Sequence, residues 1–506
     1  MRFNLKHKAQ DEIVNYELAT AYKMSPEMEL YTAVVTTSLS NNFYEKANNR
    51  LDRIRLLVKQ NDPLFVAKLA VYAREKMHLR SIPLVLVSEL AKVHNGNDLV
   101  SRAIKKVIRR ADEITELLAY YQFANERNGT KKLNKLSRQM QKGIAQAFNQ
   151  FDEYQFAKYN RKAEVTLKDA LFITHPKAKD EAQQALFDNI VTDQLQVPYT
   201  WETELSKLGQ KDFVSESAKK KAFKAKWEEL IESQKLGYMA LLRNLRNILE
   251  AEVDFGYIKQ IAQRLGDAKE VRRAKQLPFR FLAAYRELKA LRHTDVTILL
   301  NALEKAVKIS VEHIRGFNEN TKVLIASDVS GSMQYNISPK SKILYYDIGL
   351  MLSMLLKSKC QRVMSGIFGD TWKVVNMPSG NVLQNVNNLY KLQNTVGFST
   401  NGHLVIRELI KSKTKVDKVL FFTDMQMWNS TSHHDSLQLA WKDYKRAVAP
   451  KAKLYLFDLA GYGQLPIKKE MYDVQLIAGW SDKIFDMLHA LERGSNAVAE
   501  IEEIVV

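Results

Sequence analysis

Three oxygen-bearing side chains with the spacing D-x-S-x-S, those of Asp328, Ser330 and Ser332, lie in the stretch DVSGSM. They directly follow a short apolar run that begins at Lys322, which predicts a strand leading into a loop. Such a loop can direct one carboxylate and two hydroxyls at a single hard cation, and Gly331 permits the tight turn. The alternative is a serine-rich turn with incidental acids.

Two later residues extend this candidate site. Thr400 lies in GFSTNG, and Asp424 ends the apolar run VLFFTD. A few carboxylate and hydroxyl ligands suit Mg²⁺, with Mn²⁺ as the alternative, better than Zn²⁺. A serine hydrolase would need G-x-S-x-G and a positioned histidine, and the DVSGSM loop supplies neither. We therefore expect a divalent metal cofactor at these residues.

The region after about residue 320 alternates between strands and helices. We expect strands at 322–328, 362–368, 371–377, 418–423 and 453–459, and helices at 341–358, 403–411, 435–447 and 481–492. This pattern predicts a doubly wound, Rossmann-like α/β domain with a mainly parallel sheet. Ligands of such sheets bind beyond the carboxyl ends of the strands, where Asp328 and Asp424 lie.

Residues 10–315 show a different pattern, with apolar residues three and four positions apart and little alternation. This predicts helices throughout, and breakers such as Asp62-Pro63 and Asn128-Gly129 divide them into segments of roughly 10 to 20 residues. Stacked helical hairpins, as in HEAT-like repeats, fit this pattern, although no clean sequence period accompanies it. The expected domains are 1–318 and 319–506.

The net charge of +19 over 506 residues predicts attraction to polyanions. Residues 1–300 carry 51 Lys and Arg against 37 Asp and Glu, while 301–506 carry 25 against 20. The excess is steepest in residues 101–150, with 11 basic against 4 acidic side chains. The polyanion-binding candidate is therefore the helical region, unless these charges form an ordinary solvated helix surface.

Cysteine usage and hydropathy set the expected compartment. The single cysteine, Cys360, allows no intramolecular disulfide and no cysteine-based metal cluster. No apolar stretch has the length needed to span a bilayer, and the first ten residues do not lead into a signal peptide. We expect a cytoplasmic protein without a membrane partner.

The second half resembles the von Willebrand factor A domain. Asp328, Ser330, Ser332, Thr400 and Asp424 match its metal-ion-dependent adhesion site position by position. The resemblance implies a cation that keeps one coordination position for an acidic residue of a protein ligand. It does not imply hydrolysis.

The first half resembles the TROVE module of the Ro autoantigen family. The similar stretches include residues 136–177, YTWETELSKLG from Tyr199, KLGYMALLRNLRNI from Lys235 and LPFRFLAAY from Leu277. TROVE followed by an A domain is the order found in Ro proteins. The resemblance implies a monomeric ring of helical repeats, with Y RNAs bound outside and single-stranded RNA 3′ ends in a basic central hole. For bacterial relatives it also implies cooperation with an exoribonuclease.

The resemblance carries Y-RNA contacts over to Lys158, Lys162 and His175. From the residues alone, Lys158, Arg161 and Lys162 fall within one helical turn and could engage successive phosphates. His175 could stack on RNA, or could simply end a helix before Pro176. Further basic candidates for the hole, which could equally face solvent, are Lys131, Lys132, Lys135, Arg138, Arg243 and Arg246.

Aromatic side chains between residues 120 and 159 could stack on bases, but their spacing is more typical of a helical core. They are Tyr120, Tyr121, Phe123, Phe148, Phe151, Tyr154 and Tyr159. We expect them to be core.

Three function classes stay open at this point. The favoured one is a non-catalytic RNA chaperone or scaffold of Ro type, acting in RNA quality control. The alternatives are a metal-dependent protein-adhesion scaffold and an enzyme acting on RNA ends. Against the enzyme, the sequence holds no P-loop and no H-E-x-x-H motif.

Overall fold

The computed structural model describes residues 12–506 except 38, 40–43, 126–135, 161, 313, 340, 379, 429–434 and 469–472. The chain forms two compact units. One, the α/β unit, comprises Met1–Leu57, Lys275–Tyr285 and Glu304–Glu500. The other, the helical unit, comprises Val58–Ala274, Arg286–Leu303 and Ile501–Val506. The units are therefore discontinuous in sequence, and the first 57 residues belong with the α/β domain.

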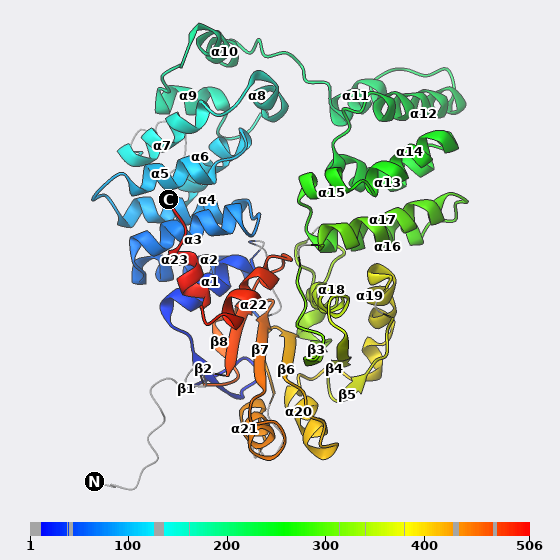
Figure 1. Cartoon of the computed structure of the whole chain (residues 1–506). Coiled ribbons are helices and arrows are strands. Elements are labelled where there is room, and N and C mark those ends of the chain that lie inside the picture. The colour runs from blue at the N-terminus through cyan, green and yellow to red at the C-terminus, as the bar shows by residue number, and fades with distance from the viewer. Residues whose placement is uncertain are drawn as a thin grey trace. The chain divides into compact units, whose positions relative to one another are not determined.

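The helical unit consists of short helices, as the sequence pattern predicts (Figure 1). Their bounds are α3 Pro63–Glu75, α4 Ser81–Val93, α5 Leu99–Val107, α6 Asp112–Ala124, α7 Arg138–Phe148, α8 Glu153–Tyr159, α9 Leu167–Thr174, α10 Glu181–Val191, α11 Trp201–Gly209, α12 Glu216–Glu232, α13 Tyr238–Glu250, α14 Phe255–Leu265 and α15 Ala268–Ala274. Helices α2 Ala47–Gln60, α16 Pro278–Lys289, α17 Val296–Ser310 and α23 Ala497–Glu502 cross the boundaries between the units.

Local sequence explains where these helices begin. Pro63 starts α3, and the Asp62 side chain accepts a hydrogen bond from the Phe65 N–H at 3.1 Å. The cap satisfies an N–H group that the helix itself leaves without a partner. Thr166 caps α9 in the same way at 3.1 Å from the Asp169 N–H.

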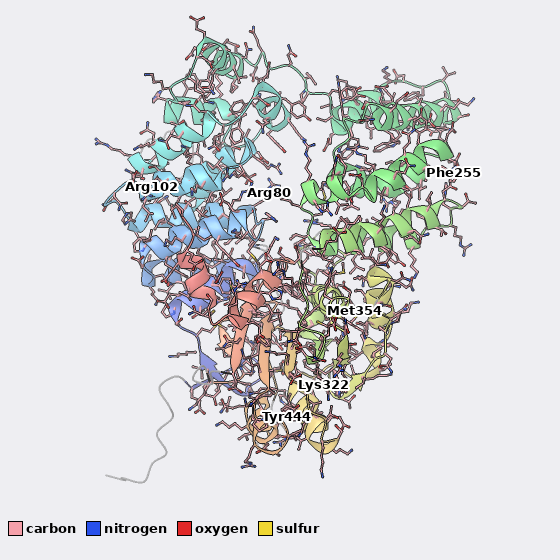
Figure 2. The ribbon with its side chains drawn as sticks, in the orientation of Figure 1. Arg80, Arg102, Phe255, Lys322, Met354 and Tyr444 are labelled. Carbon is pink, nitrogen blue, oxygen red and sulfur yellow. The ribbon has the colours of Figure 1, made fainter. Side chains whose placement is uncertain are left out.

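Neighbouring helices pack closely. Helix α3 lies against α4 and α5, α5 against α7, and α11 against α12. At the α5–α7 crossing a Cβ atom on Gly143 would lie 2.8 Å from the Cβ atom of Ile104, so only glycine fits there without a shift. In Figure 2, Arg102 marks α5 and Phe255 marks α14.

The α/β unit contains a six-stranded sheet in the order β5-β4-β3-β6-β7-β9. The strands are β3 Lys322–Asp328, β4 Arg362–Phe368, β5 Trp372–Val374, β6 Lys418–Thr423, β7 Lys453–Asp458 and β9 Val474–Ala478. All neighbours pair in parallel except β4 and β5. The chain winds outward from β3 to β4 and then returns to β6 on the other side of β3. This reversal is the topological switch point where ligands bind in doubly wound sheets.

Helices cover the sheet, as expected for a doubly wound domain (Figure 1). They are α18 Tyr345–Lys357, α19 Val382–Lys391, α20 Gly402–Lys411, α21 Leu437–Ala447 and α22 Ile484–Glu492. Leu324 of β3 and Phe421 of β6 pack in one cluster with Val405 of α20 and Trp441 of α21. Lys322 marks the start of β3 and Tyr444 marks α21 in Figure 2.

The expectation of helix throughout residues 10–315 is wrong at its beginning. Strands β1 Glu12–Val14 and β2 Thr20–Lys23 form an antiparallel hairpin, followed by helix α1 Pro26–Val35. Strand β2 also pairs with β8 Gln464–Leu465, some 440 residues later. The hairpin thus depends on a distant partner, which short-range periodicity does not register.

Other boundaries differ by a few residues. The helix expected from residue 341 begins at Tyr345, and the strand expected over 371–377 shortens to β5. No described helix is long and apolar enough to cross a membrane.

Candidate functional site

Adjacent strand ends bring the two candidate metal-binding carboxylates to one edge of the sheet. Strands β3 and β6 run in parallel register, with Ser327 opposite Phe422. Asp328 ends β3, and Asp424 directly follows β6. All five candidate residues are buried, Ser332 being the most exposed at 5%. The sheet therefore places the acids where the switch point predicts a ligand.

Hydrogen bonds fix both acids and their loops. Asp328 Oδ1 accepts from the Ser330 N–H at 2.9 Å, and its Oδ2 accepts from the Thr423 hydroxyl at 2.6 Å. Asp424 Oδ1 accepts from the Gln426 N–H at 3.0 Å. The hydroxyl oxygens of Ser330 and Ser332 lie 3.4 Å apart. Thr423 is a positioning residue that sequence reasoning missed, although it directly precedes Asp424.

The loop that carries Thr400 is hydrogen-bonded to the D-x-S-x-S loop and to the segment that follows Asp424. The Gly331 N–H donates to the Phe398 carbonyl at 2.8 Å, and the Trp428 N–H donates to the Thr400 carbonyl at 2.9 Å. Asp370 Oδ1 accepts from the N–H groups of Phe398 and Ser399 at 3.1 and 2.7 Å, which shapes the loop. The structure thus joins the D-x-S-x-S loop, the Thr400 loop and the Asp424 segment.

The electrostatics of this cluster favour a cation. Burial raises the pKa of Asp328 to about 6, and burial together with the charge of Asp328 raises the pKa of Asp424 to about 8. Asp424 Oδ2 is buried and has no hydrogen-bond partner among the described residues. Two buried acids with one free oxygen are unfavourable unless a proton or a cation neutralises them.

The donor set fits a hard divalent ion. Asp328 and Asp424 provide carboxylate oxygens, and Ser330, Ser332 and Thr400 carry hydroxyls, all of which suit Mg²⁺ or Mn²⁺. Among the described residues no group of three or more His, Cys, Asp or Glu side chains could hold a metal. Any ion here therefore depends on hydroxyl or water ligands besides the two acids.

A third buried acid, Asp458, ends the neighbouring strand β7. Its Oδ1 accepts from the N–H groups of Ala460 and Gly461 at 3.0 and 2.7 Å, and burial raises its pKa to about 6. The buried Arg50 donates to the Ala460 carbonyl at 2.6 Å. Sequence reasoning singled out neither Arg50 nor Asp458, although a strand-end Asp was a usable signal.

Lys158 is the best-placed of the candidate RNA contacts. It lies in the last turn of α8, with its Nζ 5.7 Å from the ring centres of both Tyr154 and Tyr159. Arg110 stacks over the Tyr159 ring at 4.4 Å. Lys158 has no ion pair within the described chain, so its charge is available to a phosphate.

The expected placement of Lys158, Arg161 and Lys162 in one helical turn is wrong. Helix α8 ends at Tyr159, and Asn160 caps it with extended backbone. Lys162 therefore lies beyond the helix and is exposed. Arg161 lies outside the described residues.

An open cavity of about 520 Å³ lies beside Lys158. Its lining comes from the end of α8, from the segment that leads into α11 and from α11 itself. The lining residues are Ala157, Lys158, Asn160, Leu195, Gln196, Val197, Pro198, Thr200, Glu202, Thr203 and Ser206. Sequence reasoning did not associate residues 195–206 with Lys158, since no motif links them.

The remaining described basic candidates lie on other helices than Lys158. His175 is exposed and caps α9 in a left-handed conformation with φ of 46°, which agrees with a helix-ending histidine. Arg138 begins α7, and Arg243 is exposed on α13. Arg246 is ion-paired with Glu250 at 3.6 Å and with Glu287 at 3.2 Å. Lys131, Lys132 and Lys135 lie outside the described residues.

Several basic side chains of residues 101–150, the segment with the largest excess of positive charge, form ion pairs within the chain. Arg102 pairs with Asp98 at 3.0 Å and Arg110 with Asp112 at 2.8 Å, and Arg109 pairs with Glu75. The count of charges in residues 101–150 therefore overstates the charge available to RNA.

The aromatic residues divide between core and surface. Tyr121, Phe148 and Phe151 are buried, in agreement with the core interpretation. Phe123 and Tyr154 are 61% and 48% exposed, so the expectation that they are core is wrong. Periodicity did not detect these two because each lies close to buried residues of the same helix.

Comparison with known proteins agrees with both halves of this fold. The TROVE domain model matches residues 25–222 and 193–297, and the Ro60 vWA domain model matches residues 322–490. The chain superimposes on the crystal structure of the Deinococcus radiodurans RO (RSR) protein with a TM-score of 0.60 and 18% identity. The match covers 93% of this chain and all of the other, and it supports the fold.

Two curated relatives are each named telomerase protein component 1. The rat protein is 26% identical over 305 residues, which is 45% of this chain and 11% of the relative. The mouse protein is 24% identical over 364 residues, which is 56% of this chain and 13% of the relative. The chain thus spans only a small part of either relative's length. Because the TROVE model alone matches more than half of the chain, and a Ro60 vWA domain follows it, the chain belongs to the Ro family of TROVE-domain proteins.

Proposed function

We propose that this chain is a non-catalytic RNA-binding component of a ribonucleoprotein of Ro type. It binds a small, Y-like noncoding RNA on the helical unit and single-stranded 3′ ends of misfolded RNA in the central hole that the Ro resemblance implies. This activity belongs to RNA quality control in the cytoplasm. The protein acts as a monomer, and an exoribonuclease is a candidate partner.

The observation that carries the proposal is the group formed by Lys158, Tyr154, Tyr159 and Arg110. A cation without an ion pair in the described chain lies near two tyrosine rings, and a guanidinium stacks on one of them. Phosphates bind such cations, and unpaired bases stack on exposed rings such as Tyr154. The adjacent cavity offers space for a nucleotide.

The test is a binding titration by gel shift, with a structured RNA that has a single-stranded 3′ tail and with the same RNA lacking it. We expect the full chain to bind the tailed RNA more tightly and to cleave neither. Lys158→Glu should lower affinity by about tenfold, a cost of roughly 1.4 kcal/mol. The matched control is Lys451→Glu, which makes the same charge change at an exposed position in the α/β unit.

Equal losses of RNA affinity in the two variants would show that the effect comes from net charge alone. Lys158 would then not belong to the binding site. Cleavage that requires Mg²⁺ would favour the enzyme acting on RNA ends.

A second candidate function is metal-dependent adhesion to an acidic protein ligand. It is favoured by Asp424 Oδ2, which is buried and has no hydrogen-bond partner in the part of the chain that the structure describes. In both readings Asp328, Ser330, Ser332, Thr400 and Asp424 would hold Mg²⁺ or Mn²⁺, and the ion would supply a positive centre for a carboxylate. Asp328→Ala separates the two. Retained RNA binding after loss of the metal supports the RNA function, whereas weak RNA binding by the unaltered chain supports adhesion.

A further inference from the structure

The turn between β1 and β2 is fastened to the segment that carries Asp424. The Asn15 side-chain amide donates to the Met427 carbonyl at 2.7 Å, and the Tyr16 N–H donates to Gln426 Oε1 at 3.0 Å. Asn15 is buried, and its Oδ1 accepts from the N–H groups of Glu17 and Ala19 at 3.0 and 2.9 Å. The position of Glu17 is therefore fixed relative to residues 424–427.

Aromatic packing holds a second residue, Tyr44, beside this turn. The rings of Tyr16 and Tyr44 stack with centroids 5.0 Å apart, and both meet the Tyr462 ring edge-on, at 5.6 and 5.4 Å. Tyr462 is buried and follows β7, the neighbour of β6. Three segments far apart in sequence thus form one aromatic cluster.

The Tyr44 hydroxyl connects Glu17 to the candidate metal site. It donates to the Glu17 carboxylate and also lies within hydrogen-bonding range of the Ser332 side chain. The electrostatic effects agree with this proximity. The charge of Asp424 raises the pKa of Tyr44, and the charge of Glu17 contributes to the raised pKa of Asp328.

We propose that Glu17, held by Tyr44, is an internal acidic group whose negative charge weakens the binding of an external carboxylate at the metal site. Glu17 is not one of the metal's fixed ligands, because no three acidic side chains come within joint reach of an ion in the described chain. It lies one hydroxyl away from Ser332, so its negative charge is placed to oppose the approach of an external carboxylate to the site. The inference rests on the proposed metal site. It predicts that the unaltered chain binds external carboxylates only weakly at this site.

The test uses the full chain loaded with Mn²⁺ and acetate as the external carboxylate. Water-proton relaxation reports displacement of Mn²⁺-bound water by acetate. We expect Glu17→Gln to bind acetate about tenfold more tightly than the unaltered chain. The same variant should bind Mn²⁺ several-fold more weakly, because a nearby negative charge is lost. Tyr44→Phe should shift acetate affinity in the same direction by releasing the Glu17 side chain.

The matched control is Glu12→Gln, an acid-to-amide change in β1 of the same hairpin. Equal acetate affinity in Glu17→Gln, Glu12→Gln and the unaltered chain would overturn the inference. Failure of the metal site itself gives a different result, since the unaltered chain would then bind Mn²⁺ no better than Asp328→Ala. Folding of each variant is checked by its thermal transition in EDTA.

Discussion

The raised pKa values of Asp328 and Asp424 couple the stability of the α/β unit to pH. The unfolded chain releases these protons near pH 4, whereas the folded protein retains them to about pH 6 and 8. Between these limits the folded state binds more protons than the unfolded state. Without metal, therefore, stability is highest at the acidic end of this window and falls as pH rises, by up to about 1.4 kcal/mol per pH unit for each proton.

We expect the melting temperature in EDTA to be lower at pH 8 than at pH 5.5. Mg²⁺ should raise the melting temperature more at pH 8, because protons then no longer compete with the ion for the two carboxylates. Differential scanning calorimetry measures both. Asp424→Asn should flatten the pH dependence in EDTA and reduce the Mg²⁺ effect. Stability that increases with pH in EDTA across this window would contradict the assignment.

The candidate metal site was predictable from the sequence where its residues lie close together in the chain or at the end of an apolar run. Asp328, Ser330 and Ser332 share one loop, and Asp424 ends an obvious apolar run. Glu17 and Tyr44 were not predictable, because they approach Ser332 across about 300 residues and through a hydroxyl contact that leaves no sequence pattern. Whether the site holds a metal stays a prediction.

At the scale of elements, the crossing of α5 and α7 sets a limit on side-chain size. A Cβ atom on Gly143 would lie 2.8 Å from Ile104 Cβ and 3.0 Å from the Ser101 Cα atom. We expect Gly143→Ala to lower the free energy of unfolding of the helical unit by about 1–3 kcal/mol through overpacking. Urea denaturation followed by circular dichroism measures the change.

The control is Gly256→Ala in α14, where an added Cβ meets nothing within 4 Å. Alanine favours a helix over glycine by up to about 1 kcal/mol, so this variant should be neutral or stabilising. Equal effects at both positions would mean that the α5–α7 contact does not limit side-chain size.

The elements that sequence reasoning placed correctly are those with strong internal signals. The predicted bounds of β3, β4 and β6 agree with the structure, and the carboxyl-terminal half of each strand is buried. The β1–β2 hairpin and β9 were missed. The hairpin is stabilised by pairing with the distant strand β8, which leaves no pattern in the sequence nearby. Strand β9 is a short edge strand that is only partly buried, so its run of buried apolar residues is weak.

At the scale of the whole molecule, the net charge of +19 overstates the charge that RNA can use. Arg102, Arg109 and Arg110 already pair within the chain. We expect the logarithm of affinity for single-stranded RNA to fall with the logarithm of salt concentration by about 0.7 per phosphate contact. Fluorescence anisotropy over a range of KCl concentrations gives this slope.

Lys158→Glu should reduce the slope by about one contact, whereas Lys451→Glu should leave it unchanged. A slope near zero for the unaltered chain would show that phosphate contacts do not drive binding.

The pairing of β2 with β8 also has a consequence for synthesis. Tyr22 and Leu465 are register partners, so the hairpin's outer edge has no strand to pair with until the chain beyond residue 465 has left the ribosome. At about 5–20 residues per second, that interval is on the order of half a minute or more. The β1–β2 hairpin must wait through this interval with its strand edge uncovered, which makes it a natural client for chaperones during translation.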